Sequence, residues 1–204
     1  DTIYFVNENL DFVLKEKYKN DVLNTTSFFN TCDINLDGTL EIYSGTQVFN
    51  NKGVLIFDGG AGGCNSINLS NQCFGSHSIA GDFLTEPGLE IAAGNKIFSF
   101  QINNLNDTAG NMANITMAEP GVEDGSTSMG DIDGDGKLDV IVLRNGINSS
   151  ETGLWVWDPR TGKIIAHSFT EGSGGGVPFV GDINGDCFPE IGISYVNKIV
   201  FYSF

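Results

Sequence analysis

The sequence predicts an all-β protein built from repeated units, and three observations support this prediction. The chain of 204 residues contains 27 glycines and only 18% charged residues, a composition typical of short strands joined by turns. A nine-residue acidic loop recurs four times, at residues 33–41, 82–90, 131–139 and 182–190, and we call these loops 1 to 4. Their first residues are 49, 49 and 51 positions apart, and a fixed period of about 50 residues is the length of one propeller blade. We therefore expect a segment of a β-propeller with four-stranded blades.

Short strand-like segments flank every acidic loop. Residues 26–29, 78–80, 127–129 and 178–180 precede the loops, and the apolar segments 40–43, 89–92, 138–143 and 189–194 follow them. Farther along, a Pro- and Gly-containing turn at 158–162 separates two further strand-like segments. Each repeat is thus predicted to have four strands, with the acidic loop between the first and second. The run Val140–Leu143 lacks polar alternation, which predicts sheets covered on both faces, as in stacked blades.

The repeats divide the chain into a half blade, three complete blades and an incomplete blade. The predicted boundaries are 1–22, 23–75, 76–122, 123–172 and 173–204. The polar segments 103–125 and 145–153 are expected to be exposed loops on the blade edges, and the glycine-rich segment 172–176 a connection between blades. Because the chain begins and ends inside blades, we expect a piece of a larger ring with flanking domains in the same polypeptide.

The acidic loops hold the ligands that a hard divalent cation requires. They contain 13 of the 26 acidic residues, and loop 3 alone places four carboxylates within nine residues. Oxygen ligands in this number favour Ca²⁺ over the octahedral, water-retaining Mg²⁺. Ligands are predicted at positions 1, 3, 5, 7 and 9, position 7 through its backbone carbonyl: Asp33, Asn35, Asp37, Thr39 and Glu41; Asp131, Asp133, Asp135, Lys137 and Asp139; and Asp182, Asn184, Asp186, Phe188 and Glu190.

The four loops are not equivalent. Loops 1 and 3 have Gly38 and Gly136 at position 6, where a sharp turn requires a positive φ. Loop 4 has Cys187 there, so its backbone must either relax or hold a side-chain residue in an unfavourable region. Loop 2 has Leu84 at position 3 and Pro87 at position 6, and proline fixes φ at about −65°. About three Ca²⁺ sites are therefore predicted, and the loop 2 acids Asp82, Glu86 and Glu90 are expected to hold metal weakly or not at all.

The loop pattern D-x-[DN]-x-D-G-x-x-[DE], placed between strands, resembles the FG-GAP or VCBS repeat of integrin α chains and of many secreted bacterial proteins. An EF-hand loop needs a bidentate acid at position 12, where this chain has Ser44, Ala93, Val142 and Ile193. The resemblance implies Ca²⁺-stabilised blades in a secreted or surface-attached protein. It favours an exported bacterial protein over an integrin.

Composition excludes some classes of partner. The formal net charge is −16, and the chain has only ten Lys and Arg residues and no basic patch, which excludes binding to nucleic acid. No apolar run approaches the ~20 residues of a membrane span, so no membrane insertion is expected. Four bound Ca²⁺ ions would cancel half of the formal charge. The remaining partner classes are an extracellular protein and a glycan.

The cysteines and sequons also indicate an extracellular setting. Cys64 and Cys73 bracket a polar loop and are predicted to form a disulfide in an oxidising compartment, with two free thiols as the alternative. A bridge between Cys32 and Cys187 would require the first and fourth blades to be neighbours, as in a four-blade ring. Sequons begin at Asn24, Asn68, Asn106, Asn114 and Asn148, which suits a glycosylated surface protein or reflects an asparagine-rich composition.

Few residues are candidates for catalysis or ligand recognition. His77 begins the strand before loop 2 and could face a ligand, but no nucleophile with a paired acid accompanies it. Trp155 and Trp157 share a face of one strand, where they could stack on sugar rings or pack between blades. We therefore expect a non-catalytic, Ca²⁺-stabilised extracellular propeller for adhesion or ligand recognition. The alternatives are the scaffold or catalytic domain of a polysaccharide-degrading enzyme, since some polysaccharide lyases resemble this calcium-loop pattern, and a sugar-binding lectin.

Overall fold

The computed structural model describes residues 2–6, 12–17, 28–60, 66–67, 73–74, 77–145, 151–172, 174–195 and 198–203. All regular structure in these ranges is β-strand. Among the described residues there is accordingly no helix of the length and hydropathy that a membrane crossing requires. The predicted fold class, all-β, is confirmed.

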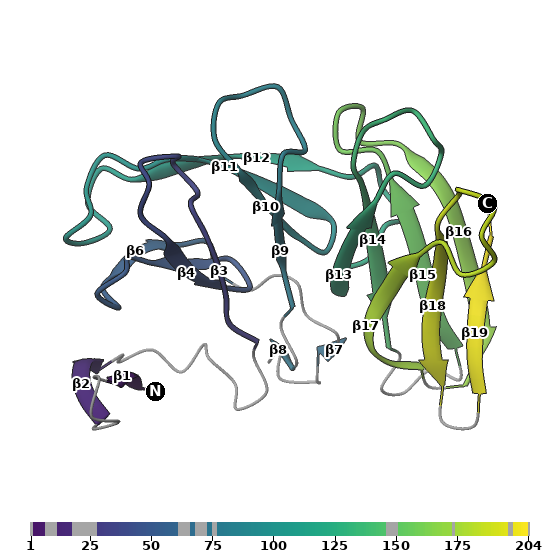
Figure 1. Ribbon diagram of the computed structural model, residues 1–204, viewed down its shortest axis with the longest axis horizontal. Helices are drawn as coiled ribbons and strands as arrows, with labels where there is room; N and C mark the ends of the chain where they lie inside the picture. The colour runs from purple at the N-terminus through teal and green to yellow at the C-terminus, as the bar shows by residue number, and fades with distance from the viewer. Residues whose placement is uncertain are drawn as a thin grey trace.

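Four antiparallel sheets follow one another along the chain as the blades of a β-propeller arrangement (Figure 1). Blade 1 contains β3 (Asn30–Cys32), β4 (Glu41–Ser44), β5 (Gln47–Phe49) and β6 (Leu55–Asp58); blade 2 contains β9 (Ile79–Gly81), β10 (Glu90–Ala93), β11 (Lys96–Gln101) and β12 (Met112–Met117); blade 3 contains β13 (Ser126–Gly130), β14 (Asp139–Arg144), β15 (Glu151–Trp157) and β16 (Ile164–Glu171); blade 4 contains β17 (Gly174–Gly181), β18 (Glu190–Tyr195) and β19 (Lys198–Tyr202). In each blade the strands are ordered in space as they are in the chain.

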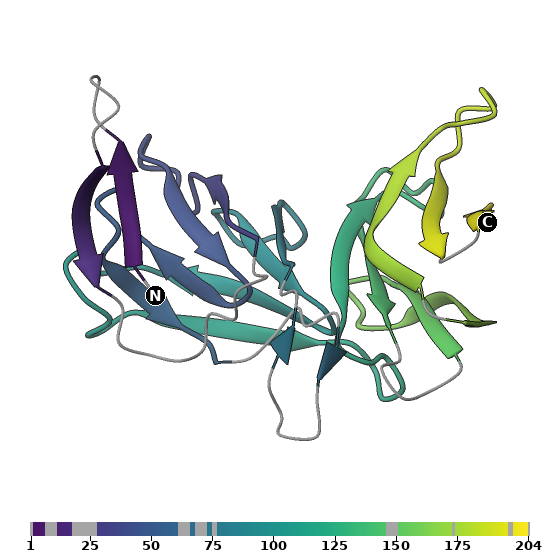
Figure 2. The ribbon, with the colours of Figure 1, turned by 90° about the horizontal axis from the view of Figure 1, so that it is seen from below.

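Two small hairpins accompany the blades. β1 (Thr2–Val6) pairs with β2 (Phe12–Lys17), in the region expected to be a half blade, and β7 (Ser66–Ile67) pairs with β8 (Cys73–Phe74). Figure 2 shows the sheets following one another along an arc, with β1 and β2 at one end and blade 4 at the other. The first strand of blade 3, β13, contacts the first strands of both neighbouring blades, β9 and β17.

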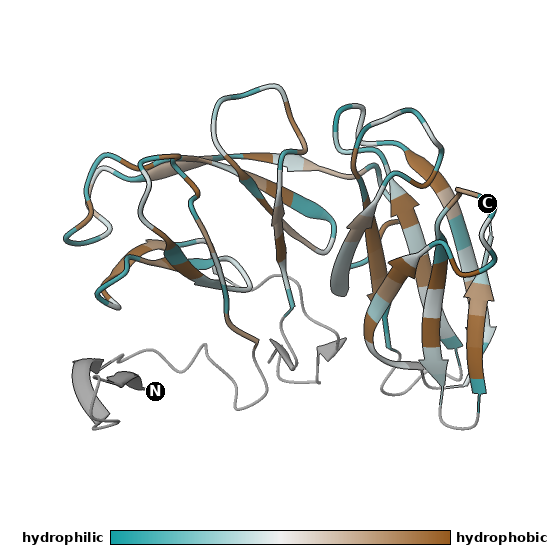
Figure 3. Ribbon diagram, viewed as in Figure 1, coloured by the Kyte–Doolittle hydropathy of each residue, from teal (hydrophilic) through white to brown (hydrophobic). Residues whose placement is uncertain are grey.

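Apolar side chains from both faces of the blades fill the space between neighbouring sheets. On β14, Val140 and Val142 pack toward blade 2, whereas Ile141 and Leu143 pack toward blade 4. All four side chains are fully buried. Alternate residues of one strand thus serve two different cores, which confirms the inference drawn from the missing polar alternation. Figure 3 shows the resulting apolar colour along the strands of blades 3 and 4.

Most predicted strands lie within one or two residues of their expected positions, but four expectations are wrong. The segment 145–153, expected to be an exposed loop, contains the start of β15, because residues 151–153 pair with β16; residues 146–150 lie outside the described residues. The first strand of blade 1 begins at Asn30; of the predicted segment 26–29, residues 28–29 are not strand and residues 26–27 lie outside the described residues. The segment 103–125, expected to be an exposed loop, contains β12, because Met112–Met117 pairs with the whole length of β11. The glycine-rich segment, expected to connect blades, contributes Gly174–Gly176 to β17.

Candidate metal loops

The acidic loops all join the first and second strands of their blades, on the upper side of the view in Figure 1. In each loop the carboxylate at position 9 begins the second strand and is buried: Glu41, Glu90, Asp139 and Glu190 are 1%, 1%, 0% and 4% exposed. Each accepts a hydrogen bond from the backbone N–H at position 2, over 3.0, 2.8, 2.9 and 2.8 Å respectively. We call this hydrogen bond the latch. It closes the loop and satisfies a backbone donor that would otherwise be buried without a partner.

The latch also fixes a residue that the sequence analysis did not single out. The side chain at position 2 inserts between its own blade and the next, as Ile34, Phe83 and Ile132 do with exposures of 2–3%. The fourth equivalent, Ile183, is 47% exposed at the last described blade. An apolar residue recurs at position 2 in all four repeats, and this periodic signal could have identified it. The loops therefore contribute directly to the packing between blades.

Loops 1, 3 and 4 share a second set of hydrogen bonds around a common centre. The aspartate at position 1 accepts the N–H of position 6, from Gly38, Gly136 or Cys187, over 2.8–2.9 Å. The carboxylate at position 5 accepts the N–H of position 7, and the side-chain oxygen at position 3 accepts the N–H of position 5. These bonds curl the backbone of the loop around the side chains of positions 1, 3 and 5. Whether the carbonyl of position 7 ligates a metal stays a prediction.

Positive φ angles make this curl possible. Position 6 has φ of +88° at Gly38, +80° at Gly136 and +72° at Cys187. Position 4 also has positive φ, including +58° at Leu36. Cys187 thus lies in the left-handed region although it has a side chain. This is the second of the two possibilities that the sequence left open.

Loop 3 has the geometry of a cation site. One oxygen each from Asp131, Asp133 and Asp139 lies within 4.8 Å of the others. The Oδ1 atoms of Asp131 and Asp139 are buried and accept no hydrogen bond. Burial raises the pKa of Asp139 to about 6, more than its hydrogen bond to Ile132 lowers it. Buried acceptors without donors are unfavourable, and a divalent cation among these oxygens would satisfy them, so the residues fit Ca²⁺.

Loop 2 has the latch but lacks the cluster of carboxylate oxygens found in loop 3. Glu90 accepts the N–H groups of both Phe83 and Leu84, over 2.8 and 3.1 Å, and Leu84 packs against the core between blades 2 and 3. Pro87 has no N–H to donate at position 6, and the positive φ shifts to Gly88 at position 7. Burial raises the pKa of Glu90. Asp82 and Glu86 are exposed, and the predicted ligands of this loop do not form a cluster like that of loop 3.

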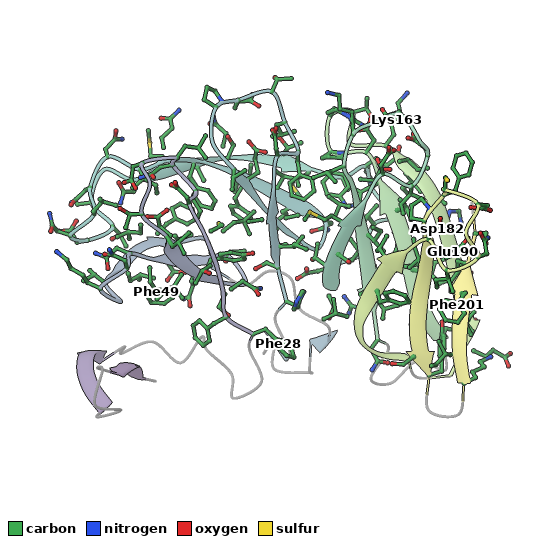
Figure 4. All side chains as sticks on the ribbon, viewed as in Figure 1. Phe28, Phe49, Lys163, Asp182, Glu190 and Phe201 are labelled. Carbon is green, nitrogen blue, oxygen red and sulfur yellow. The ribbon has the colours of Figure 1, made fainter. Side chains whose placement is uncertain are left out.

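Loops 1 and 4 share the hydrogen bonds of loop 3 but use an amide at position 3, and among the described residues their acids do not form a three-carboxylate cluster like that of loop 3. In loop 4 the Asn184 side chain donates to Asp186 and Glu190, over 3.0 and 2.8 Å. In loop 1 Asn35 donates to Asp37 over 3.1 Å. Figure 4 labels Asp182 and Glu190, the first and last residues of loop 4. In both loops the amide nitrogen at position 3 donates to carboxylate oxygens that are predicted ligands of the cation.

Residues 131–193 match the model of the FG-GAP-like repeat. The match begins at the first aspartate of loop 3 and ends in β18, so it covers one full period together with loop 4. It confirms the predicted resemblance. A comparison with curated proteins and another with solved structures found no match.

The other candidate residues lie away from the centres of the acidic loops. His77 is half-buried, its Nδ1 lies 2.9 Å from the carbonyl oxygen of Thr127, and its ring packs edge-on against Phe28. Burial lowers the pKa of His77. The indoles of Trp155 and Trp157 are 3% and 0% exposed in the core between blades 2 and 3, which agrees with packing and leaves no face open to a sugar.

The cysteine and sequon predictions are tested only in part. Cys32 and Cys187 are both free, so the bridge considered between blades 1 and 4 is not formed. Burial raises the pKa of the Cys32 thiol to about 12, which makes it unreactive. The predicted bridge from Cys64 to Cys73 lies outside the described residues, because Cys64 is not among them. Of the sequons, Asn106 and Asn114 are exposed, and Asn24, Asn68 and Asn148 fall outside the described ranges.

Proposed function

We propose that this chain is a calcium-stabilised, non-catalytic propeller module of an extracellular protein, with Ca²⁺ bound in loops 1, 3 and 4. The pair of buried oxygens without donors, Asp131 Oδ1 and Asp139 Oδ1, carries the proposal. They belong to a loop whose backbone already curls around a common centre. Extracellular Ca²⁺ is millimolar, and modules of that compartment bind it with dissociation constants of about 10⁻⁴–10⁻³ M. The FG-GAP-like match supports this setting, because such repeats are typical of extracellular proteins.

The role of the ion follows from the latch. Loops 1, 2 and 3 place their position-2 side chains between two blades, and all four loops start the second strand with a buried carboxylate. Bound Ca²⁺ would neutralise that carboxylate and hold the loop in one conformation, so that the packing between blades becomes more stable. The ligands then enclose the ion and leave no position for a reacting molecule, which favours a structural over a catalytic role.

Thermal unfolding in Ca²⁺ and in chelator tests the metal proposal. A ligand that binds only the folded state at 100 times its dissociation constant adds about 2.7 kcal/mol per site to the free energy of unfolding. We expect the midpoint temperature to rise by at least several degrees with Ca²⁺ and far less with the same concentration of Mg²⁺. An unchanged midpoint in saturating Ca²⁺ contradicts the proposal.

For the whole molecule we propose adhesion or ligand recognition, with an extracellular protein or a glycan as the partner class. The non-catalytic part is supported by His77, whose Nδ1 lies beside a backbone carbonyl oxygen and not beside an acid, the partner that orients a catalytic histidine. Binding to a glycan array, together with an assay of polysaccharide cleavage, tests this part. Cleavage by the purified chain would contradict the non-catalytic role, and binding without cleavage would support it.

A further inference from the structure

Arg160 lies close to loop 3 although it belongs to a different connection. It sits in the turn between β15 and β16, which is on the same side of blade 3 as loop 3; Lys163 marks this turn in Figure 4. Its Nη2 lies 3.1 Å from Asp135 Oδ2 and 3.9 Å from Asp139 Oδ1. These are two of the four carboxylates assigned to the ion. A guanidinium therefore occupies the outer side of the proposed calcium site.

The turn holds Arg160 in this position. Asp158 Oδ1 accepts both the backbone N–H and the Nε–H of Arg160, over 3.0 and 2.7 Å. Asp158 also accepts the hydroxyl of Thr161 over 2.8 Å. The guanidinium is thus oriented before any ion arrives, and little side-chain entropy is lost when it contacts loop 3.

The contact is incomplete in two respects. Arg160 Nη1 is buried and donates no hydrogen bond, and Asp139 Oδ1, at 3.9 Å, is too far for one. Asp135 is 45% exposed, and ion pairs at such half-exposed positions are weak. Several carboxylates in a closed shell bind Ca²⁺ more strongly than one such pair binds a guanidinium. The ion and Arg160 compete for the same oxygens, and the ion prevails at sufficient concentration.

A pocket beside loop 3 could receive the Arg160 side chain when an ion displaces it. The pocket, of about 310 Å³, separates loop 2 from loop 3, and Arg160 lines it together with Asp82, Thr85 and Leu138. Asp82 is exposed and belongs to the loop expected to hold metal weakly or not at all, so its carboxylate would be the acceptor for the displaced guanidinium. Loop 2 would in this way act as an acceptor for Arg160 rather than as an ion site.

Among the described residues, the ion pairs of the acidic loops involve loop 3 alone. Blade 1 has a similar turn between its third and fourth strands, where Asn50 Oδ1 accepts the N–H of Lys52 as Asp158 accepts that of Arg160. Lys52 is exposed, and no described ion pair links it to loop 1. Loop 1 thus provides an internal reference for a loop without a competing cation.

We propose that Arg160 is a built-in counter-cation that lowers the Ca²⁺ affinity of loop 3 and is displaced when the ion binds. This inference rests on the proposed calcium binding. A unit charge about 5 Å from a divalent ion changes its affinity by about tenfold at physiological salt. Arg160 also reduces the repulsion among the carboxylates at low Ca²⁺, so loop 3 stays folded when it is empty and fills at higher Ca²⁺ than loop 1.

The test is a Ca²⁺ titration followed by amide NMR of the full chain, with Gly136 reporting loop 3 and Gly38 reporting loop 1. Arg160→Gln should lower the midpoint for Gly136 by about tenfold and leave that for Gly38 unchanged. Arg144→Gln is the matched control, since Arg144 ends β14 at the opposite end of blade 3 and pairs with Glu123 over 2.7 Å. It removes the same charge from the same blade and should shift neither midpoint.

A second measurement uses the native protein and does not depend on the folding of a variant. Arg144 and Arg160 are the only arginines of the chain, so their Nε–H signals can be resolved and compared. Ca²⁺ should shift the Arg160 signal in step with the Gly136 amide and leave the Arg144 signal in place. An Arg160 signal that ignores Ca²⁺ while Gly136 titrates, or an unchanged Gly136 midpoint in Arg160→Gln, overturns the inference but leaves calcium binding intact. If neither glycine amide responds to Ca²⁺, calcium binding itself is wrong, and the inference falls with it.

Discussion

Loops 2 and 3 occupy the same place in neighbouring blades, yet they are stabilised in different ways. Both begin the second strand with a fully buried acid, Glu90 or Asp139, and both use it to latch the N–H of position 2. In loop 2 the acid takes a second backbone donor and an apolar residue fills position 3. In loop 3 an oxygen of the same acid lacks a donor and faces two further aspartates. The comparison separates two features of the repeat. The latch is common to both loops and stabilises the blade, whereas the cluster of ligand oxygens is found in loop 3 and not in loop 2.

The largest expected effect comes from neutralising the latch acid in each loop. Asp139→Asn and Glu90→Gln keep an oxygen that can accept the position-2 N–H, so neither should cost more than about 1 kcal/mol in chelator. In saturating Ca²⁺, Asp139→Asn should lose about 3–4 kcal/mol relative to the native chain, because a site filled to 100–1,000 times its dissociation constant contributes about that much. Glu90→Gln should lose none. Urea unfolding with and without Ca²⁺ measures both variants.

The sign of the chelator result adds a check on the electrostatics. Burial raises the folded-state pKa of Asp139 to about 6, so its ionised form is unfavourable in the empty loop at neutral pH. Asp139→Asn should therefore be neutral or slightly stabilising in chelator at pH 7.5 and destabilising only in Ca²⁺. If the calcium increment is lost equally in both variants, the two loops do not differ as described.

A second, smaller effect should follow from giving loop 2 the missing cluster of ligand oxygens. Leu84→Asp with Pro87→Gly restores an oxygen at position 3 and a flexible donor at position 6, beside the existing acids Asp82 and Glu86. The double variant should gain a calcium-dependent stabilisation of about 2 kcal/mol, less than loop 3 supplies, because position 5 is a longer glutamate. In chelator it should be less stable than the native chain, since Leu84 leaves an apolar core.

Isothermal titration of Ca²⁺ into the same variant supplies the control, because one additional ion per chain is expected. Leu84→Asp alone leaves Pro87 in place and should add none. A stoichiometry that does not change in the double variant would mean that the position of the backbone, rather than the ligand set, excludes the ion from loop 2.

The blade pattern could be predicted from the sequence because it is periodic. The spacing of the first aspartates and the apolar runs after each loop located four successive blades. Gly38 and Gly136 predicted the positive φ angles that the structure has at these positions. The segment containing β12 was misassigned because the residues on both sides of the strand are polar and turn-forming, although residues 113–117 alternate between apolar and polar side chains. Pairing with β11 along six residues fixes it as a strand, and the five-residue alternation alone was too short a signal among the polar residues around it.

The features of the site that sequence reasoning missed depend on contacts between distant residues. Arg160 lies 25 positions after Asp135, in a turn that looked like an ordinary hairpin connection. Only the folded blade brings this turn to the side that carries the acidic loop. The packing role of Ile34, Phe83 and Ile132 was missed for a different reason. These residues lie between the alternate ligand positions that define the loop motif, so they are not part of it.

The smallest expected effect compares position 6 in loops 3 and 4, which make the same hydrogen bond with different residues. A Cβ at Gly136 would meet nothing within 4 Å, so Gly136→Ala tests the backbone alone, at a φ of +80°. It should cost about 1 kcal/mol, the penalty for a side chain in the left-handed region. Cys187→Gly, at +72°, should remove that strain and stabilise the fold by about 0.5 kcal/mol after the greater entropy of glycine in the unfolded chain is counted.

Both changes in stability should be the same in chelator and in Ca²⁺, because each acts on the loop backbone before an ion binds. Thermal unfolding at constant ionic strength measures them. A loss of stability in Cys187→Gly would show that the cysteine side chain contributes packing of its own, and loop 4 would then differ from loop 3 in more than its strain.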